Sequence, residues 1–167
     1  MKHRLFLVIT LAIACSFSTK PFAYYFATVD PETGRDGTKP EKTIATYIKP
    51  KGKATTADYT IAGAKSSKRL KIAEAVFNAY PEESTATLNP SLYIFLYKVS
   101  VGKTTRTLTM NPDGSSSMYI PVTITKPDGY TIRVSPAIAM QPGEYVIVDK
   151  TTTTADGNVT VWTFGID

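Results

Sequence analysis

Apolar and polar residues alternate along most of this chain with a period of two, which is the period of a β-strand. Prolines, glycines and other turn formers separate the alternating runs. The clearest runs are YYFATV (24–29), KTIATYIKP (42–50), DYTIA (58–62), SLYIFLYKVSV (91–101), TRTLTM (105–110), SMYIPVTIT (117–125), YTIRVSP (130–136), GEYVIVDK (143–150) and VTVWTFGID (159–167). Short strands at intervals of roughly ten to fifteen residues predict an all-β fold, a β-sandwich of Ig-like or transthyretin-like character.

One segment, residues 66–80, fits two regular structures. As a helix it places Ile72, Val76 and Tyr80 on one face, and Ser67 can cap its first turn. As a strand its alternation is less regular. Because the pattern on both sides is β, we predict a strand here and keep the helix as the alternative.

The run at residues 91–99 is apolar on both of its faces. One face carries Leu92, Ile94 and Leu96, and the other carries Tyr93, Phe95 and Tyr97. Only one face of a sheet meets its partner sheet in a sandwich, so the second face needs a cover: a helix, a long loop, another chain or a ligand. The aromatic row is therefore either core or a stacking platform for a carbohydrate.

The first residues have the pattern of an export signal. A basic start at residues 2–4 precedes an apolar run at residues 5–14, which is too short to span a membrane as a helix. We predict a signal-peptide helix at residues 1–18, with cleavage between 14 and 23. The β-sandwich domain then occupies residues 24–167.

This leader contains the one cysteine and the one histidine of the chain, Cys15 and His3. The stretch Ala12-Ile13-Ala14-Cys15 partly matches the cleavage box of bacterial lipoproteins, so Cys15 is a candidate for lipidation; the alternative is a discarded apolar residue. After cleavage the body has no histidine or free thiol for catalysis. That excludes Ser-His-Asp and Cys-His mechanisms and the usual zinc, copper and iron sites. We predict no enzyme, no cofactor and no metal site.

Carboxylates leave two weaker alternatives. The adjacent Glu82 and Glu83, or another acidic pair, could serve a small carboxylate-based hydrolase. The oxygen-rich turns at residues 30–36 and 156–158 could surround calcium, although their spacing does not match an EF-hand. A solvated surface turn explains both stretches without a metal.

Charge is unevenly distributed along the chain, whose net charge is +5. Residues 39–71 contain nine basic and two acidic side chains, whereas residues 72–167 contain six basic and nine acidic ones. A basic face could bind anionic envelope polymers, or its lysines could only protect edge strands. The candidate residues for an anionic partner are Lys49, Lys51, Lys53, Lys65, Lys68, Arg69 and Lys71.

The C-terminal part resembles small exported bacterial β-sandwich proteins of uncharacterised function. The shared features are the strand 91–99, Arg106, the PGEY turn at 142–145 and the FGID ending at 164–167. The resemblance implies the fold and export, and adds no site.

We therefore expect an exported, non-catalytic protein of the periplasm, outer envelope or extracellular space. It would act as a binding or structural component of the bacterial envelope or secretome. Its partner would be a protein or an envelope polysaccharide, with no nucleic acid, and with a membrane only through a lipid anchor. The first alternative is a carbohydrate-binding module that uses Tyr93, Phe95 and Tyr97, and the second is the hydrolase.

Overall fold

The computed structural model describes residues 24–53, 55–81, 89–111 and 113–167, and its elements are strands and single 3-10 turns. The strands are β1 (Tyr24–Thr28), β2 (Glu41–Ile48), β3 (Ala57–Ala62), β4 (Arg69–Leu70), β5 (Phe77–Pro81), β6 (Ile94–Lys98), β7 (Ser100–Val101), β8 (Thr105–Met110), β9 (Tyr119–Ile120), β10 (Val122–Thr125), β11 (Ile132–Pro136), β12 (Gly143–Asp149) and β13 (Val159–Ile166). The turns are η1 (Ile72–Glu74), η2 (Pro90–Leu92) and η3 (Lys150–Thr152). The all-β prediction is confirmed.

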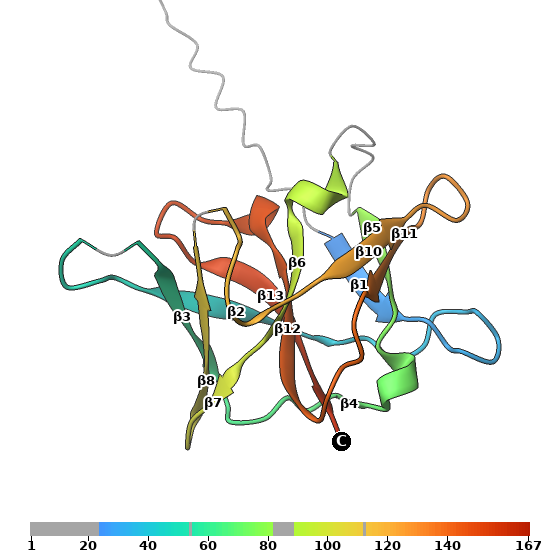
Figure 1. Cartoon of the computed structure of the whole chain (residues 1–167), viewed down its shortest axis with the longest axis horizontal. Helices are drawn as coiled ribbons and strands as arrows, with labels where there is room; N and C mark the ends of the chain where they lie inside the picture. The colour runs from blue at the N-terminus through green and yellow to red at the C-terminus, as the bar shows by residue number, and fades with distance from the viewer. Residues whose placement is uncertain (1–23, 54, 82–88, 112) are drawn as a thin grey trace, which may run out of the picture.

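Two sheets pack against each other in a sandwich (Figure 1). The small sheet has the order β1-β5-β11-β10, and all of its pairs are antiparallel. The large sheet has the order β7-β8-β3-β2-β13-β12-β6-β9, and the short β4 joins β13 in parallel. No helix in the described part of the chain is long and apolar enough to cross a membrane.

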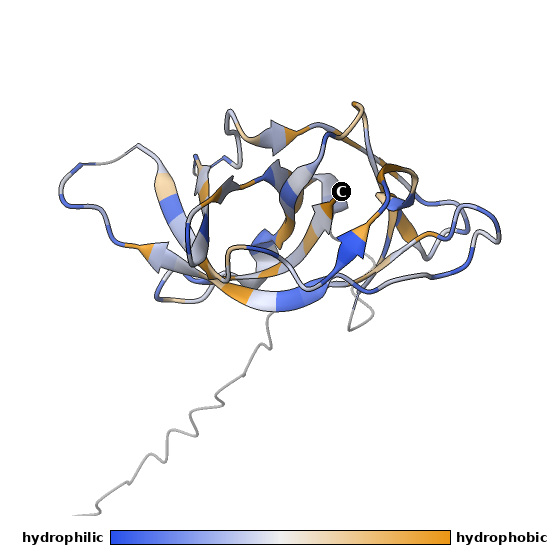
Figure 2. Ribbon diagram, turned by 90° about the horizontal axis from the view of Figure 1, so that it is seen from below, coloured by the Kyte–Doolittle hydropathy of each residue, from blue (hydrophilic) through white to orange (hydrophobic). Residues whose placement is uncertain are grey.

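The large sheet curls until it closes on itself. Only Val99 separates β6 from the end strand β7 in the chain. However, β6 pairs with β12 on one side of the sheet, whereas β7 pairs with β8 on the other. One bent stretch of chain thus joins the two sides of the sheet, and β8, β3, β2, β13, β12 and β6 form a ring. Figure 2 shows this curl from below.

Ring closure explains why residues 91–99 are apolar on both faces. Tyr97 and Val99 lie inside the ring, among Ile61, Leu108, Val146 and other buried side chains. Ile94 and Leu96 face the opposite way, into the core of the sandwich. The cover for the second face is therefore the sheet itself, because curling brings β3 and β8 over the aromatic side.

The core between the two sheets is rich in aromatic residues. Phe26 meets Trp162 edge to face at 4.8 Å between ring centroids, and Phe77 lies 4.9 Å from Phe164. Phe26 and Phe77 come from the small sheet, and their partners come from β13. Such contacts fix the small sheet on the outer face of the ring.

Segment 66–80 is not helical. It forms the two-residue β4, the single turn η1 and then β5, so the strand prediction holds only at residues 69–70 and 77–80. Phe77 and Ala79 alternate into the core while β5 pairs with β1 and β11. These long-range pairs outweigh the local helical pattern, and they leave Ile72 49% exposed.

Candidate functional site

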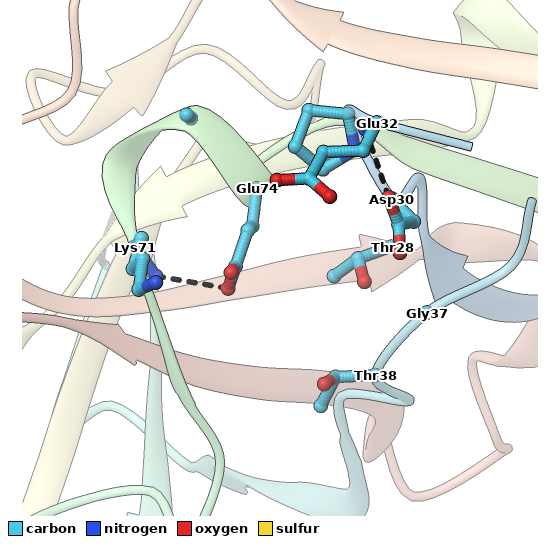
Figure 3. A pocket seen from close by; sticks show the side chains of 9 residues that line it. Thr28, Asp30, Glu32, Gly37, Thr38, Lys71 and Glu74 are labelled. Atoms are coloured by element: carbon cyan, nitrogen blue, oxygen red, sulfur yellow. Dashed lines mark hydrogen bonds between the residues drawn. The ribbon is translucent and has the colours of Figure 1, made fainter. Parts of the chain in front are cut away.

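A pocket of about 350 Å³ opens beside the sandwich, between the chain at residues 28–38 and the turn η1 (Figure 3). Figure 3 shows Thr28 and Thr38 on one side of this space, and Glu74 with Lys71 on the other. The residues that line the pocket are Thr28, Asp30, Pro31, Glu32, Gly37, Thr38, Lys71, Ala73 and Glu74.

The first wall is a tight hairpin that continues from β1. Thr28 N donates to Thr38 O at 2.8 Å, and Gly37 N donates to Thr28 O at 2.7 Å. At the tip, Asp30 Oδ1 accepts hydrogen bonds from the amides of Glu32 and Thr33 at 2.8 and 3.0 Å. These amides lower the pKa of Asp30, so its carboxylate stays ionised and is occupied by the turn.

The second wall is the turn η1. Glu74 Oε2 accepts the backbone amide of Lys71 at 3.1 Å, which fixes one oxygen of its carboxylate. Val29 N donates to Val76 O at 2.7 Å, and this bond ties the second wall to the first. The pocket is therefore held open by backbone hydrogen bonds and does not depend on a mobile side chain.

Thr28 is the unusual residue of this pocket. It is only 3% exposed, but its hydroxyl makes no hydrogen bond to any described residue and is not sealed from solvent. Gly37 leaves the space beside it open, because a methyl group at Gly37 would lie 2.7 Å from Thr28 Oγ1. This hydroxyl therefore faces the open space of the pocket, where a ligand can hydrogen-bond to it.

Three further side chains bring polar atoms to the lining. The hydroxyl of Thr38 and the carboxylate of Glu32 form no hydrogen bond within the described part of the chain. The carboxylate of Glu74 uses one oxygen for Lys71 N and leaves the other to the pocket. Together they offer hydroxyls that donate or accept and carboxylates that accept.

The aromatic row predicted at Tyr93, Phe95 and Tyr97 does not form an exposed platform. Tyr97 is fully buried inside the ring, where its hydroxyl donates to Gly114 O at 2.5 Å. Phe95 is half-buried and packs against the buried side chains inside the ring. Tyr93 lies between η2 and the first residue of β6. Of the two alternatives for this row, core or stacking platform, the burial of Tyr97 favours core, because curling turns this face inward.

The predicted basic residues fall into two groups. Lys49, Lys51 and Lys53 lie in the loop between β2 and β3, which projects to the left in Figure 1. Lys65, Lys68, Arg69 and Lys71 lie in the segment that runs below the ring to η1. Arg69 is paired with Glu144 and Asp167, so it is not available to an anionic partner.

In the described part of the chain, no group of three or more His, Cys, Asp or Glu side chains is arranged so that it could hold a metal ion. In the turn once considered for calcium, Asp36 Oδ1 accepts from Asn78 Nδ2 and Tyr80 Oη, both at 2.9 Å. Glu82 and Glu83 lie outside the described residues, as do the whole leader and its His3 and Cys15.

Sequence analysis named Lys71 and the turn at residues 30–36 for other ligands, but it did not identify this pocket or Thr28. Thr28 ends an ordinary strand pattern, and nothing in its neighbours shows that its hydroxyl would be left without a partner. The one available indication was the concentration of turn formers in DPETGRDG (30–37). Comparisons with protein-family models, curated proteins and solved structures found no match to this chain, so the geometry alone carries the functional argument.

Proposed function

We propose that this protein is an exported, non-catalytic binding module, and that the pocket between residues 28–38 and η1 binds a saccharide or a similar polyol. The observation that carries the proposal is the hydroxyl of Thr28, which reaches the solvent at the edge of a preformed pocket and makes no hydrogen bond to a described residue. A ligand hydroxyl placed there would both donate and accept, which satisfies Thr28 and its neighbours at once.

The charges of the lining restrict the ligand further. Asp30, Glu32 and Glu74 bring three carboxylates, whereas Lys71 brings one ammonium group. An anionic ligand would be repelled by this surplus of negative charge. Neutral sugars and amino sugars fit it, because carboxylates accept hydrogen bonds from hydroxyl and ammonium groups alike.

Catalysis is the less supported alternative. A glycosidase needs a carboxylic acid with a raised pKa beside a second carboxylate. The pKa of Asp30 moves down, because backbone amides stabilise its ionised form. We therefore favour retention of the sugar over its hydrolysis.

The test of binding is a titration followed by amide chemical shifts in NMR. Glucose, N-acetylglucosamine and glucosamine are the probes, and glucuronate is the anionic comparison. We expect shifts at residues 28–38 and 71–74 with the neutral and cationic sugars, and none with glucuronate.

A matched pair of variants identifies the hydroxyl. Thr28→Val keeps the shape of the side chain and should weaken binding by roughly three- to tenfold, the range expected for one hydrogen bond. Thr123→Val, on exposed β10, should change nothing. Absence of shifts with every sugar would refute the proposed ligand class.

Export itself is a proposal from the leader. Mass spectrometry of protein from the native envelope fraction would give its first residue and any lipid on Cys15. A retained Met1 would contradict export through a cleaved signal peptide.

A further inference from the structure

The ring of the large sheet has two ends that differ in chemistry. At one end lie Arg106, Glu144 and Glu41, which are charged. At the other end a cavity of about 310 Å³ opens among aromatic and apolar side chains. Its lining includes Tyr47, Tyr59, Met110, Asn111, Lys150 and Gly157. We call this second cavity the ring mouth; it is separate from the pocket proposed above.

Tyr59 brings a hydroxyl group to the lining of the ring mouth. The residue is 6% exposed, and its hydroxyl makes no hydrogen bond to a described residue although it is not sealed from solvent. Burial raises the pKa of Tyr59, and the nearby Tyr47 raises it further. The phenol is therefore protonated at neutral pH and can donate into the cavity.

Tyr47 forms an aromatic wall of the ring mouth. Contacts to its backbone amide and to its ring hold it in place. Its ring lies 5.7 Å from that of Tyr59, with an angle of 54° between the planes. Its amide donates to Asn158 Oδ1 at 2.9 Å. Gly157 packs against the ring so closely that an added methyl group would lie 3.0 Å from it. The wall is thus in place before any ligand arrives.

The remaining lining sets the polarity of the ring mouth. Met110 is 4% exposed and adds a polarisable apolar surface. Lys150 holds its ammonium group 5.4 Å from the centroid of Phe95. Burial lowers the pKa of Lys150, and the nearby carboxylate of Asp113 opposes that shift. The carboxylate of Asp113 therefore offsets part of the positive charge beside the cavity.

We propose that the ring mouth is a second binding site, for a small planar aromatic molecule that carries a hydrogen-bond acceptor. The rings of Tyr47 and Tyr59 with Met110 would contact its flat apolar body. The hydroxyl of Tyr59 would donate to its acceptor atom. The mostly aromatic and apolar lining favours a neutral ligand such as an aryl ketone or amide.

Fluorine NMR with para-fluoroacetophenone tests the proposal directly, and para-fluorotoluene is the same ring without the carbonyl acceptor. We expect the ketone to bind more tightly than the toluene derivative, and to shift the amides of Tyr47, Tyr59 and Met110. Shifts confined to residues 28–38, or no saturable binding, would overturn the assignment.

The variant Tyr59→Phe isolates the donor, because it removes one oxygen and keeps the ring. We expect it to weaken the ketone by roughly three- to tenfold and to leave the toluene derivative unchanged. Equal losses for both compounds, or no loss for either, would overturn the role of the hydroxyl. An unchanged melting temperature would show that the variant is folded, and Thr123→Val, on exposed β10, should bind both compounds as the parent protein does.

Discussion

Glu144 and Arg106 meet at the charged end of the ring, where Glu144 Oε2 lies 3.7 Å from Arg106 Nη1. The other oxygen of Glu144 pairs with Arg69, which reaches it from the segment outside the ring. Both Glu144 and Arg106 have side chains that are at most 5% exposed. One buried carboxylate therefore serves two guanidinium groups, one from within the ring and one from its rim.

Backbone carbonyls bind two nitrogens of Arg106, whereas its buried Nη1 has no hydrogen-bond partner among the described residues. Its Nε donates to Gly63 O at 3.0 Å and its Nη2 donates to Ala62 O at 2.9 Å, so the guanidinium closes the turn after β3. Burial lowers the pKa of Arg106, and the carboxylates of Glu144 and Glu41 oppose this shift. An arginine stays charged under these conditions, so removal of its counter-ion should be costly.

Glu144→Gln should lower the free energy of unfolding by about 3 kcal/mol or more, because two guanidinium groups then lose their shared counter-ion in a buried site. Asp167→Asn is the matched control, since Asp167 also pairs with Arg69 but its side chain is 74% exposed. That change should cost less than about 1 kcal/mol. Urea unfolding measures both values, and similar costs would show that burial of the pair is unimportant.

Gly165→Ala should also disturb this end of the ring. A methyl group there would overlap the guanidinium of Arg69, which is bonded to Asp167 Oδ1 at 2.6 Å and paired with Glu144. We expect a loss of roughly 1–3 kcal/mol from displacement of Arg69. Gly34→Ala, where φ is +69° and the space is open, should cost about 1 kcal/mol from backbone strain alone. Additivity of Gly165→Ala with Arg69→Ala in a double-mutant cycle would contradict this mechanism.

Tyr97→Phe tests the interior of the ring. The hydroxyl of Tyr97 donates to Gly114 O at 2.5 Å, and the ring is fully buried. Loss of the hydroxyl should lower the free energy of unfolding by roughly 1–3 kcal/mol, because the carbonyl of buried Gly114 loses the hydrogen bond from Tyr97. Tyr130→Phe, at a residue that is 89% exposed, should change the unfolding free energy by less than about 0.5 kcal/mol.

Asp128 makes the β10–β11 turn sensitive to acid. Its carboxylate accepts hydrogen bonds from Thr131 Oγ1, Thr131 N and Tyr130 N at 2.6, 2.6 and 2.9 Å. These bonds lower the pKa of Asp128 from 3.8 to about 2. A depressed folded-state pKa stabilises the fold above the ordinary value, and the contribution disappears as the pH falls through the folded-state value.

The turn should therefore hold at pH 5 and loosen between about pH 4 and 2. The carboxyl carbon of Asp128, followed by NMR, should titrate near pH 2. Asp128→Asn should make the stability difference between pH 5 and 2 smaller. A midpoint close to 3.8 would show that the turn does not hold the carboxylate.

The alternating pattern predicted most strands because each has one face toward an apolar core. For β1, β8 and β12 the predicted runs begin where the strands begin, and they end at or within one residue of their ends. The pattern could not predict ring closure. Closure depends on the bend at Val99 and on the strands with which β6 and β7, the two parts of the run at residues 91–101, form pairs. The same two-sided pattern would suit a strand covered by a helix.

The candidate site was less accessible to sequence analysis for a related reason. What sets Thr28 apart is that its hydroxyl has no hydrogen-bond partner among the described residues. A missing partner leaves no pattern in the sequence. Sequence analysis did not single out Tyr59 and Tyr47, whereas Tyr97 was a candidate for a ligand platform. The three tyrosines differ in their position along the axis of the ring. The hydroxyl of Tyr97 donates to Gly114 O, whereas Tyr47 and Tyr59 line the ring mouth.

Closure at Val99 also decides how the molecule can associate. Each of the six ring strands has a hydrogen-bonded neighbour on both sides, so the large sheet offers no long free edge for intermolecular strand addition. In the small sheet, β10 is bonded to β11 on one side only. Fibre-like growth or domain exchange, if crowding or damage provoked it, would therefore start from the small sheet while the ring stayed intact.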